Sequence, residues 1–125
     1  MIGGVGIDII EVARVKEKIE KNMGFREKVF SAREVDYCES TPATKYQHYA
    51  ARFAAKEAFL KASGKGLLLS HDLNQIEIET NTDGKPIILI SDQIKKSMAL
   101  GAFHIHVSLS HLESTACAVV ILESN

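Results

Sequence analysis

Hydrophobic positions near the start of the chain change from a continuous run to helical spacing. Residues 2–10 are nearly all aliphatic or glycine, which predicts a buried strand. From Glu11 to about Met23, apolar residues recur every three or four positions, and Gly24 ends the run. This spacing predicts a first helix with one apolar stripe. The stripe consists of Val12, Val15, Ile19 and Met23.

Capping residues locate two further helices. Ser31 and Glu34 have the S-x-x-E spacing of a capping box, which predicts a short helix that ends near Glu39. An Ala-rich run of good helix formers predicts a long helix over residues 43–62, with Gly64 as a left-handed cap.

The remaining pattern alternates between strands and a helix. It predicts a strand at 75–80, a strand at 86–90, a helix capped by Ser91 that reaches Leu100, and strands at 104–110 and 115–122. Turn residues at 82–85 make the first two strands a hairpin. Because helices mix with antiparallel strands, we expect an α+β fold, formed by one compact domain over residues 1–125 around the long helix.

Composition narrows the class of protein. The chain has 125 residues, 46% of them hydrophobic, and a formal net charge of -1, which gives no electrostatic argument for nucleic acid or for an anionic membrane. The N-terminal residues lack a basic segment and a cleavage site, and no apolar run reaches the ~20 residues that span a bilayer. We therefore expect a soluble cytoplasmic protein, with Cys38 and Cys117 as reduced, buried thiols.

Two carboxylates stand where the pattern does not explain them. Asp8 interrupts the aliphatic strand and shares a face with Gly4 and Gly6, and an unpaired buried carboxylate costs several kcal/mol. Glu57 lies in the Ala-rich long helix. Ordinary explanations are a salt bridge for Asp8 and an i,i+4 pair with Lys61 for Glu57. If the helix face is packed, the two carboxylates form a hard oxygen site suited to Mg2+.

Basic residues accompany both helices. Arg52 and Lys56 form a basic ridge beside the face that carries Glu57 and Lys61. The first helix carries a basic stripe opposite its apolar face, which is either solvated surface or a dock for an acidic protein helix. This stripe consists of Arg14, Lys18 and Lys21.

Histidines and glycines near the strands suggest an anion rather than a transition metal. His104 and His106 share a strand face, but no third ligand stands at a zinc spacing. His106, Ser108 and Ser110 form a polar row that faces away from the core and suits a phosphate. The glycine-flanked Lys65, within residues 64–66, is either an ordinary helix end or a loop that follows a phosphate.

Four ordered segments resemble the signatures of the 4'-phosphopantetheinyl transferase family. They are G-I-D-I-I-E at residues 6–11, R-F-A-A-K-E-A-F-L-K at 52–61, G-K-P at 84–86 and H-V-S-L-S-H at 106–111. The length of the chain and Phe53 in the second segment are similar to the short branch of the family, holo-[acyl-carrier-protein] synthase, from end to end.

The resemblance implies a reaction and a ligand set. It implies Mg2+-dependent transfer of 4'-phosphopantetheine from coenzyme A to a serine of apo acyl carrier protein, with release of adenosine 3',5'-bisphosphate, for fatty acid biosynthesis. It assigns Asp8 and Glu57 to the metal. It assigns to coenzyme A the residues Arg52, Lys61, Gly64, Lys65, Gly66, Pro86 and His106.

The resemblance also implies an assembly and a docking face. It implies a homotrimer with active sites at subunit interfaces. It places the acidic carrier protein on the first helix, at Arg14, Lys18, Lys21 and Phe25. For catalysis we expect Lys61 to neutralise charge and Glu57, directly or through a water on the metal, to act as the base, with Asp36 as a weaker candidate for orienting that water.

Two other functions use the same residues. A non-catalytic module would grip an acidic protein with the basic stripe, and Asp8 and Glu57 would only support that interface. A metal-dependent phosphohydrolase would release phosphopantetheine to water without any carrier. Without the family resemblance, the residues alone describe an α+β domain that binds phosphate.

Overall fold

The computed structural model describes residues 1–65, 73–98 and 103–124. Its elements in chain order are β1 (Ile2–Glu11), α1 (Val12–Lys21), α2 (Phe25–Val29), α3 (Ala32–Glu39), α4 (Lys45–Ser63), the short 3-10 helix η1 (Leu73–Gln75), β2 (Ile76–Thr80), β3 (Pro86–Ile90), α6 (Asp92–Met98), β4 (Phe103–His111) and β5 (Thr115–Ser124). The predicted hairpin, the two predicted C-terminal strands and the long helix are present, so the α+β expectation is confirmed. Leu100, the predicted end of the last helix, lies outside the described residues.

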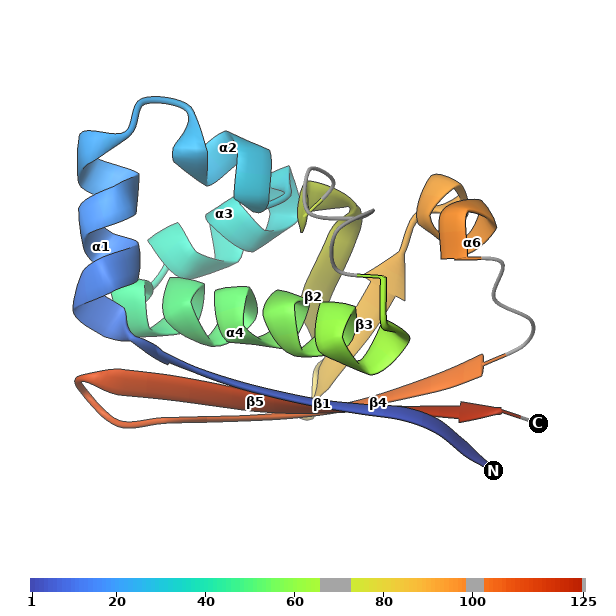
Figure 1. Ribbon diagram of the computed structural model, residues 1–125. Helices are drawn as coiled ribbons and strands as arrows, with labels where there is room; N and C mark the ends of the chain where they lie inside the picture. The colour runs from blue at the N-terminus through green and yellow to red at the C-terminus, as the bar shows by residue number, and fades with distance from the viewer. Residues whose placement is uncertain (66–72, 99–102, 125) are drawn as a thin grey trace.

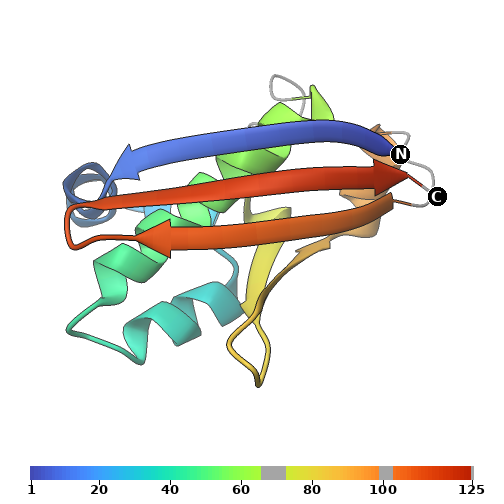
Figure 2. The same cartoon turned by 90° about the horizontal axis from the view of Figure 1, so that it is seen from below.

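The strands form two antiparallel sheets. One has the order β1-β5-β4, so β5 is its central strand, and the other is the β2-β3 hairpin. Figure 2 shows the three longer strands side by side, with α4 crossing behind them and both termini at the same end of the sheet. The register pairs Asp8 with Ala118 and Ser108 with Val119. The two outer strands, β1 and β4, therefore carry different candidate site residues to opposite edges.

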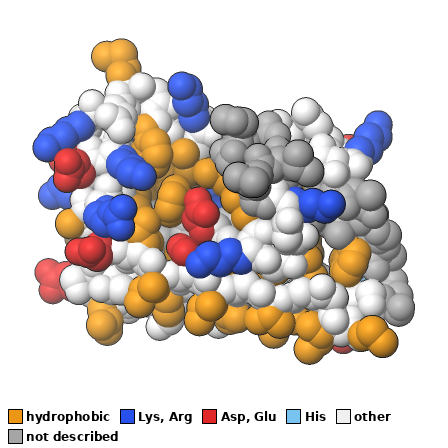
Figure 3. Space-filling model, in the orientation of Figure 1, with side chains coloured by type: hydrophobic (Ala, Val, Ile, Leu, Met, Phe, Trp, Pro, Cys, Tyr) orange, Lys and Arg blue, Asp and Glu red, His pale blue; other side chains and the backbone are white. Residues whose placement is uncertain are grey.

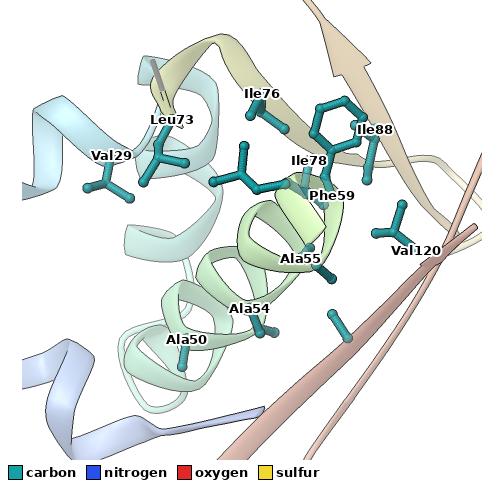
Figure 4. Packing of buried hydrophobic residues seen from close by; sticks show 14 of the residues in the cluster. Val29, Ala50, Ala54, Ala55, Phe59, Leu73, Ile76, Ile78, Ile88 and Val120 are labelled. Atoms are coloured by element: carbon teal, nitrogen blue, oxygen red, sulfur yellow. The ribbon is translucent and has the colours of Figure 1, made fainter. Parts of the chain in front are cut away.

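Helix α4 is the centre of the core. Its Ala residues allow close approach on several sides, and Ala50, Ala54 and Ala55 are fully buried. Figure 4 shows side chains of the β2-β3 hairpin and of β5 converging on this helix, with Phe59 beside Ile78 and Ile88. In Figure 1 the sheet covers one side of α4, while α2, α3 and the hairpin lie on the other. The helix is thus held on both sides, which fixes the side chains it carries.

A buried ion pair ties α4 to its neighbours, and it overturns part of the predicted basic ridge. Lys56 is completely buried, and its Nζ donates to Glu34 Oε1 at 2.7 Å, to the Leu73 carbonyl at 2.8 Å and to the Ile76 carbonyl. Glu34 also accepts from the Ser31 and Ile78 N–H groups, at 2.9 Å and 3.0 Å. Lys56 directly precedes Glu57 on α4, so the two side chains point to different sides of the helix. Because the helix is packed on both sides, Lys56 cannot share the solvent-facing side of Glu57. Lys56 is therefore structural.

The end of α1 differs from the predicted helix. The helix stops at Lys21, and Met23 is fully exposed rather than part of the apolar stripe. Gly24, at φ 86°, instead begins the short helix α2, which the periodicity did not predict because five residues span little more than one turn. The chain turns there, so Phe25 is brought back towards the core.

The strand at residues 2–10 is buried on one face only. Val5, Ile7 and Ile9 are 59%, 65% and 71% exposed, whereas the expectation was a buried strand. Figure 3 shows hydrophobic side chains in a row along the lower edge, beneath the sheet. On the same outer face, β5 presents half-buried Cys117, so only Cys38 of the two thiols is fully buried. We call this face, with Val119 and Ile121, the outer sheet face.

Candidate functional site

Asp8 and Glu57 come together where β1 crosses α4. The Asp8 side chain is 17% exposed, and Glu57 is half-buried. Burial raises the pKa of the Glu57 carboxyl, the negative charge of Asp8 raises it further, and the ammonium groups of Lys61 and Lys18 oppose the shift. Two carboxylates that repel one another in a partly buried place favour the binding of a cation.

Lys61 supplies one cation to this pair. Its Nζ donates to the Ile7 carbonyl at 2.9 Å and to Asp8 Oδ1 at 3.2 Å, and more than half of the side chain remains exposed. An exposed ion pair of this kind contributes at most about 1 kcal/mol, so it holds the side chain only loosely. Lys61 can therefore leave Asp8 and contact a ligand without a large cost.

The donor set fits a hard divalent ion. Asp8 and Glu57 offer only carboxylate oxygens, and Mg2+ is usually held by one or two carboxylates together with water and phosphate oxygens. In the described part of the chain, no group of three or more His, Cys, Asp or Glu side chains is arranged to hold a metal by itself.

A second group of site residues lies at the other edge of the sheet. It surrounds an open pocket of about 430 Å³ between α4, the β2-β3 hairpin and β4. Arg52 lies 2% exposed in its wall, donates from Nη2 to Thr80 Oγ1 at 3.0 Å, and stacks its guanidinium 4.1 Å from the centre of the Tyr37 ring. Its Nε is the one buried side-chain polar atom without a partner in the described ranges. Pro86 also lines this pocket, which we call the arginine pocket.

The arginine pocket contains polar residues that sequence reasoning did not assign. These are Tyr37, His48, Thr80, Lys85 and His111, and Ser108 of the predicted polar row lies with them. The His48 ring lies 5.4 Å from Tyr37 and 6.0 Å from His111 between ring centres, and burial, followed by the nearby Arg52 charge, lowers the pKa of His48. His48 stands one helical turn before Arg52, which is a signal that spacing could have revealed.

The other residues assigned to coenzyme A lie apart from this pocket. His106 is exposed on the outer sheet face, and its Nε2 lies 2.9 Å from Glu123 Oε1. Gly64 closes α4 in the left-handed region at φ 69°, as expected for a helix cap. The half-buried Lys65 follows it, one turn beyond Lys61. Gly66 lies outside the described residues.

Asp36 is not brought to the carboxylate pair within the chain. It is exposed on α3, next to Tyr37 of the arginine pocket, and no interaction of its side chain with Asp8 or Glu57 is present in the described ranges. Of these two candidate bases, Glu57 is the one that lies at the carboxylate pair within one chain.

The basic stripe borders the carboxylate pair. Arg14, Lys18 and Lys21 are all exposed, and they line one shallow groove on α1. Lys18 Nζ lies 5.8 Å from the centre of the Phe25 ring and 5.9 Å from that of Phe53, which stands one turn before Glu57. Figure 3 shows acidic side chains in the middle of this face with basic side chains around them. A partner seated on α1 would thus reach the carboxylate pair.

Comparison with known proteins identifies the family. The profile of the 4'-phosphopantetheinyl transferase superfamily matches residues 4–120. The holo-[acyl-carrier-protein] synthase of Cytophaga hutchinsonii is 50% identical over 100% of both chains. That of Ruminiclostridium cellulolyticum is 47% identical over 94% of this chain and 90% of the relative. A holo-(acyl-carrier-protein) synthase from Bacillus anthracis, solved in complex with CoA (3',5'-ADP), has a TM-score of 0.83 at 34% identity, over 100% of this chain and 99% of that chain.

These similarities cover nearly the whole chain and agree with the fold. The chain therefore belongs to the 4'-phosphopantetheinyl transferase superfamily. Within it, the chain is an enzyme of the holo-[acyl-carrier-protein] synthase branch. In the described ranges, none of its helices combines the length and apolar character needed to cross a membrane.

Proposed function

We propose that this enzyme transfers the 4'-phosphopantetheine group of coenzyme A to a serine of apo acyl carrier protein, using Mg2+ and releasing adenosine 3',5'-bisphosphate. The observation that carries the proposal is that the chain has two complementary groups of side chains. One is the partly buried carboxylate pair of Asp8 and Glu57, and the other is the separate, basic arginine pocket. Related synthases have been solved with coenzyme A, which supports the choice of donor. The product, holo acyl carrier protein, would serve fatty acid biosynthesis in the cytoplasm, an environment that suits the free thiols.

The arginine pocket suits the nucleotide end of coenzyme A. Its lining includes Arg52, Lys85 and two histidines, with no carboxylate among them. The unpartnered Nε of Arg52 is a buried donor that a phosphate oxygen would satisfy, and arginine binds phosphate more strongly than a neutral donor does. Pro86 and the aromatic rings offer apolar faces beside that donor.

The carboxylate pair suits the reacting pyrophosphate. Asp8 and Glu57 would hold Mg2+, which supplies Lewis-acid stabilisation of charge on phosphate oxygens when bound. Lys61 and the loop at Lys65 would contact the same phosphates, and His106 is proposed to do so from another subunit. In the chemical step, the serine Oγ attacks the phosphorus next to pantetheine, and the bond to the adenosine bisphosphate oxygen breaks. Glu57 is the proposed acceptor of the serine proton, and Asp36 is the alternative.

A homotrimer would unite the two groups of residues. Asp8 lies on one edge strand of the sheet and the arginine pocket lies at the other, so a single chain does not bring them together. A head-to-tail interface repeated around a ring would place one edge against the other edge of the next copy. The outer sheet face, with Val5, Ile7 and Ile9 exposed, supplies an apolar surface for such an interface.

A shared active site predicts that two inactive variants complement each other. We expect Glu57→Gln and Arg52→Gln chains each to have little activity alone. When the two are co-expressed and mix at random, about a quarter of the sites would combine two intact halves, so about a quarter of wild-type activity should return. The measurement is specific activity of the purified mixture against each variant alone. Activity no higher than the mean of the two variants would contradict the shared site.

The basic stripe on α1 is proposed to bind the acidic carrier protein. We expect Arg14→Glu to raise the KM for carrier protein about tenfold at low salt, with kcat little changed, because charge reversal acts mainly on encounter and orientation. The difference should shrink as salt is raised. Lys96→Glu, an exposed change on α6 far from α1 in sequence, is the matched control. An equal increase in KM for Arg14→Glu and Lys96→Glu would contradict docking of the carrier protein on α1.

The proposed reaction has a direct test. Apo acyl carrier protein is incubated with the enzyme and coenzyme A, with Mg2+ or with a chelator, and its intact mass is measured. We expect a gain of one phosphopantetheine group only when metal is present. Release of phosphopantetheine without a change in carrier mass would indicate a phosphohydrolase. No reaction with any metal, together with carrier binding, would indicate a binding module.

A further inference from the structure

Strand β1 lies unusually close to α4, at two glycines that face the helix. A methyl group on Gly6 would collide with the Ala58 carbonyl oxygen and lie 2.7 Å from the Ala62 nitrogen, and one on Gly4 would collide with the Ala62 carbonyl. All of these atoms belong to the backbone of α4, so no side-chain movement can relieve the collision. The strand and the helix therefore approach more closely than any other residue at these positions would allow.

This approach bears on the carboxylate pair. Asp8 follows Gly6 on the same face of β1, and Glu57 directly precedes Ala58, the residue that Gly6 meets. Lys61 stands one turn after Glu57 on α4, and its Nζ lies 3.2 Å from Asp8 Oδ1, so Asp8 lies beside the helix face that carries Glu57. Lys61 fastens the same region, because it donates to the Ile7 carbonyl between Gly6 and Asp8 at 2.9 Å. The contact at Gly6 thus sets how far Asp8 stands from Glu57.

We propose that Gly6 is a positioning residue that fixes the gap between Asp8 and Glu57 and so favours a small divalent ion over a larger one. The proposal rests on the proposed function, in which both carboxylates hold the metal. Mg2+ requires ligand distances of about 2.0–2.1 Å, whereas Ca2+ accepts about 2.3–2.6 Å. A gap widened by a methyl group would suit the larger ion, so the glycine acts through distance and not through any contact with the metal.

Gly4 makes the same kind of contact farther from the pair. Its collision partner is Ala62, which lies five residues after Glu57, while the partner of Gly6 is adjacent to Glu57. Alanine at either position should disturb packing to a similar extent. Only alanine at Gly6 should change the ratio of Ca2+ to Mg2+ affinity. This difference distinguishes an effect on the position of Asp8 from a general loss of stability.

The test measures metal binding, not turnover. Mg2+ and Ca2+ are titrated calorimetrically into the enzyme with saturating coenzyme A and no carrier protein. For Gly6→Ala we expect Mg2+ affinity to fall about 10-fold to 100-fold, and the ratio of Ca2+ to Mg2+ affinity to rise about tenfold. Gly4→Ala should lower the melting temperature similarly and change the ratio less than about threefold. Gly3→Ala is the matched control, because its methyl group would crowd only the Phe103 side chain and would meet the Leu122 carbonyl at an ordinary 3.7 Å.

A compensating substitution completes the test. Asp8→Glu adds one methylene, so it should restore Mg2+ affinity in the Gly6→Ala background and lower it in the wild-type background. If Gly6→Ala is too unstable to titrate at room temperature, the same titration is made well below its melting temperature, and the ratio of Ca2+ to Mg2+ affinity measured there decides. An unchanged ion ratio in these variants, or equal changes in Gly4→Ala and Gly6→Ala, would overturn the inference. If wild-type enzyme bound neither ion, the proposed metal site itself would be wrong.

Discussion

Replacing Glu57 by Gln is expected to lower turnover by at least about a hundredfold while changing coenzyme A binding far less. The substitution keeps the shape of the side chain but removes the negative charge that, in the proposed mechanism, binds the metal and accepts the serine proton. The nucleotide end of coenzyme A would still be held by the arginine pocket, which contains no part of Glu57. Single-turnover rates and direct titration of coenzyme A measure the two effects separately.

Glu113→Gln is the matched control, because Glu113 is an exposed glutamate in the turn between β4 and β5. Glu113→Gln should leave both the turnover rate and the affinity for coenzyme A unchanged. Comparable losses in turnover and in coenzyme A binding for Glu57→Gln would show that Glu57 holds the substrate rather than acting in the chemical step.

The Glu57→Gln variant should also be more stable than the wild-type chain when metal is absent. The pKa of Glu57 is raised in the folded chain, chiefly by burial, so the unfolded chain loses this proton at lower pH. Ionisation therefore favours the unfolded state, and the stability associated with this group is lost as pH rises through the raised pKa. The melting temperatures of variant and wild type should agree at acid pH and separate as pH rises towards neutral. A higher melting temperature for the wild type at neutral pH would contradict this assignment.

Removal of Lys56 is expected to destabilise the enzyme by about 3–5 kcal/mol, because it leaves a buried carboxylate without its counterion. In Lys56→Met, Glu34 would keep two backbone N–H donors, while the Leu73 and Ile76 carbonyls would lose theirs. For a chain of this length the melting temperature should fall by more than about 10 °C. Urea unfolding of the metal-free protein measures the free energy directly.

A second substitution shows whether the loss comes from the lone charge. The double variant Lys56→Met with Glu34→Gln should recover part of the stability, because no charge then remains buried. Lys21→Met removes the exposed i,i+4 pair with Glu17, at 3.5 Å, and should cost less than about 1 kcal/mol. If Lys56→Met cost no more than Lys21→Met, the buried pair would not be the anchor of α4.

Local signals in the sequence were sufficient for most elements. The capping box is present as predicted, since Ser31 Oγ accepts from the Glu34 N–H at 3.2 Å and Glu34 bonds back to the Ser31 N–H. Gly64 ends α4 in the left-handed region, and Gly84, at φ 81°, lies in the predicted hairpin turn. Each of these signals depends on residues that are close in sequence, so spacing alone reveals it.

Features that depend on distant contacts were not predictable in the same way. Lys56 appears in the sequence as one more basic residue of the long helix, and only the packing of η1 and α3 against α4 makes it a core residue. The arginine pocket joins residues of α3, α4, the hairpin and β4, which no local pattern connects. Pairing of Asp8 with Glu57 was a hypothesis from the chemistry of the two residues, and the crossing of β1 over α4 supplies its physical basis.

The outer sheet face has a consequence for how the enzyme behaves at different concentrations. In the proposed homotrimer, each chain covers Val5, Ile7 and Ile9 with another copy, so assembly depends on the concentration of the enzyme through mass action. Specific activity should then decline on dilution, even though every chain retains its own fold. The abundance of the enzyme would act as a control on its output, without any effector molecule.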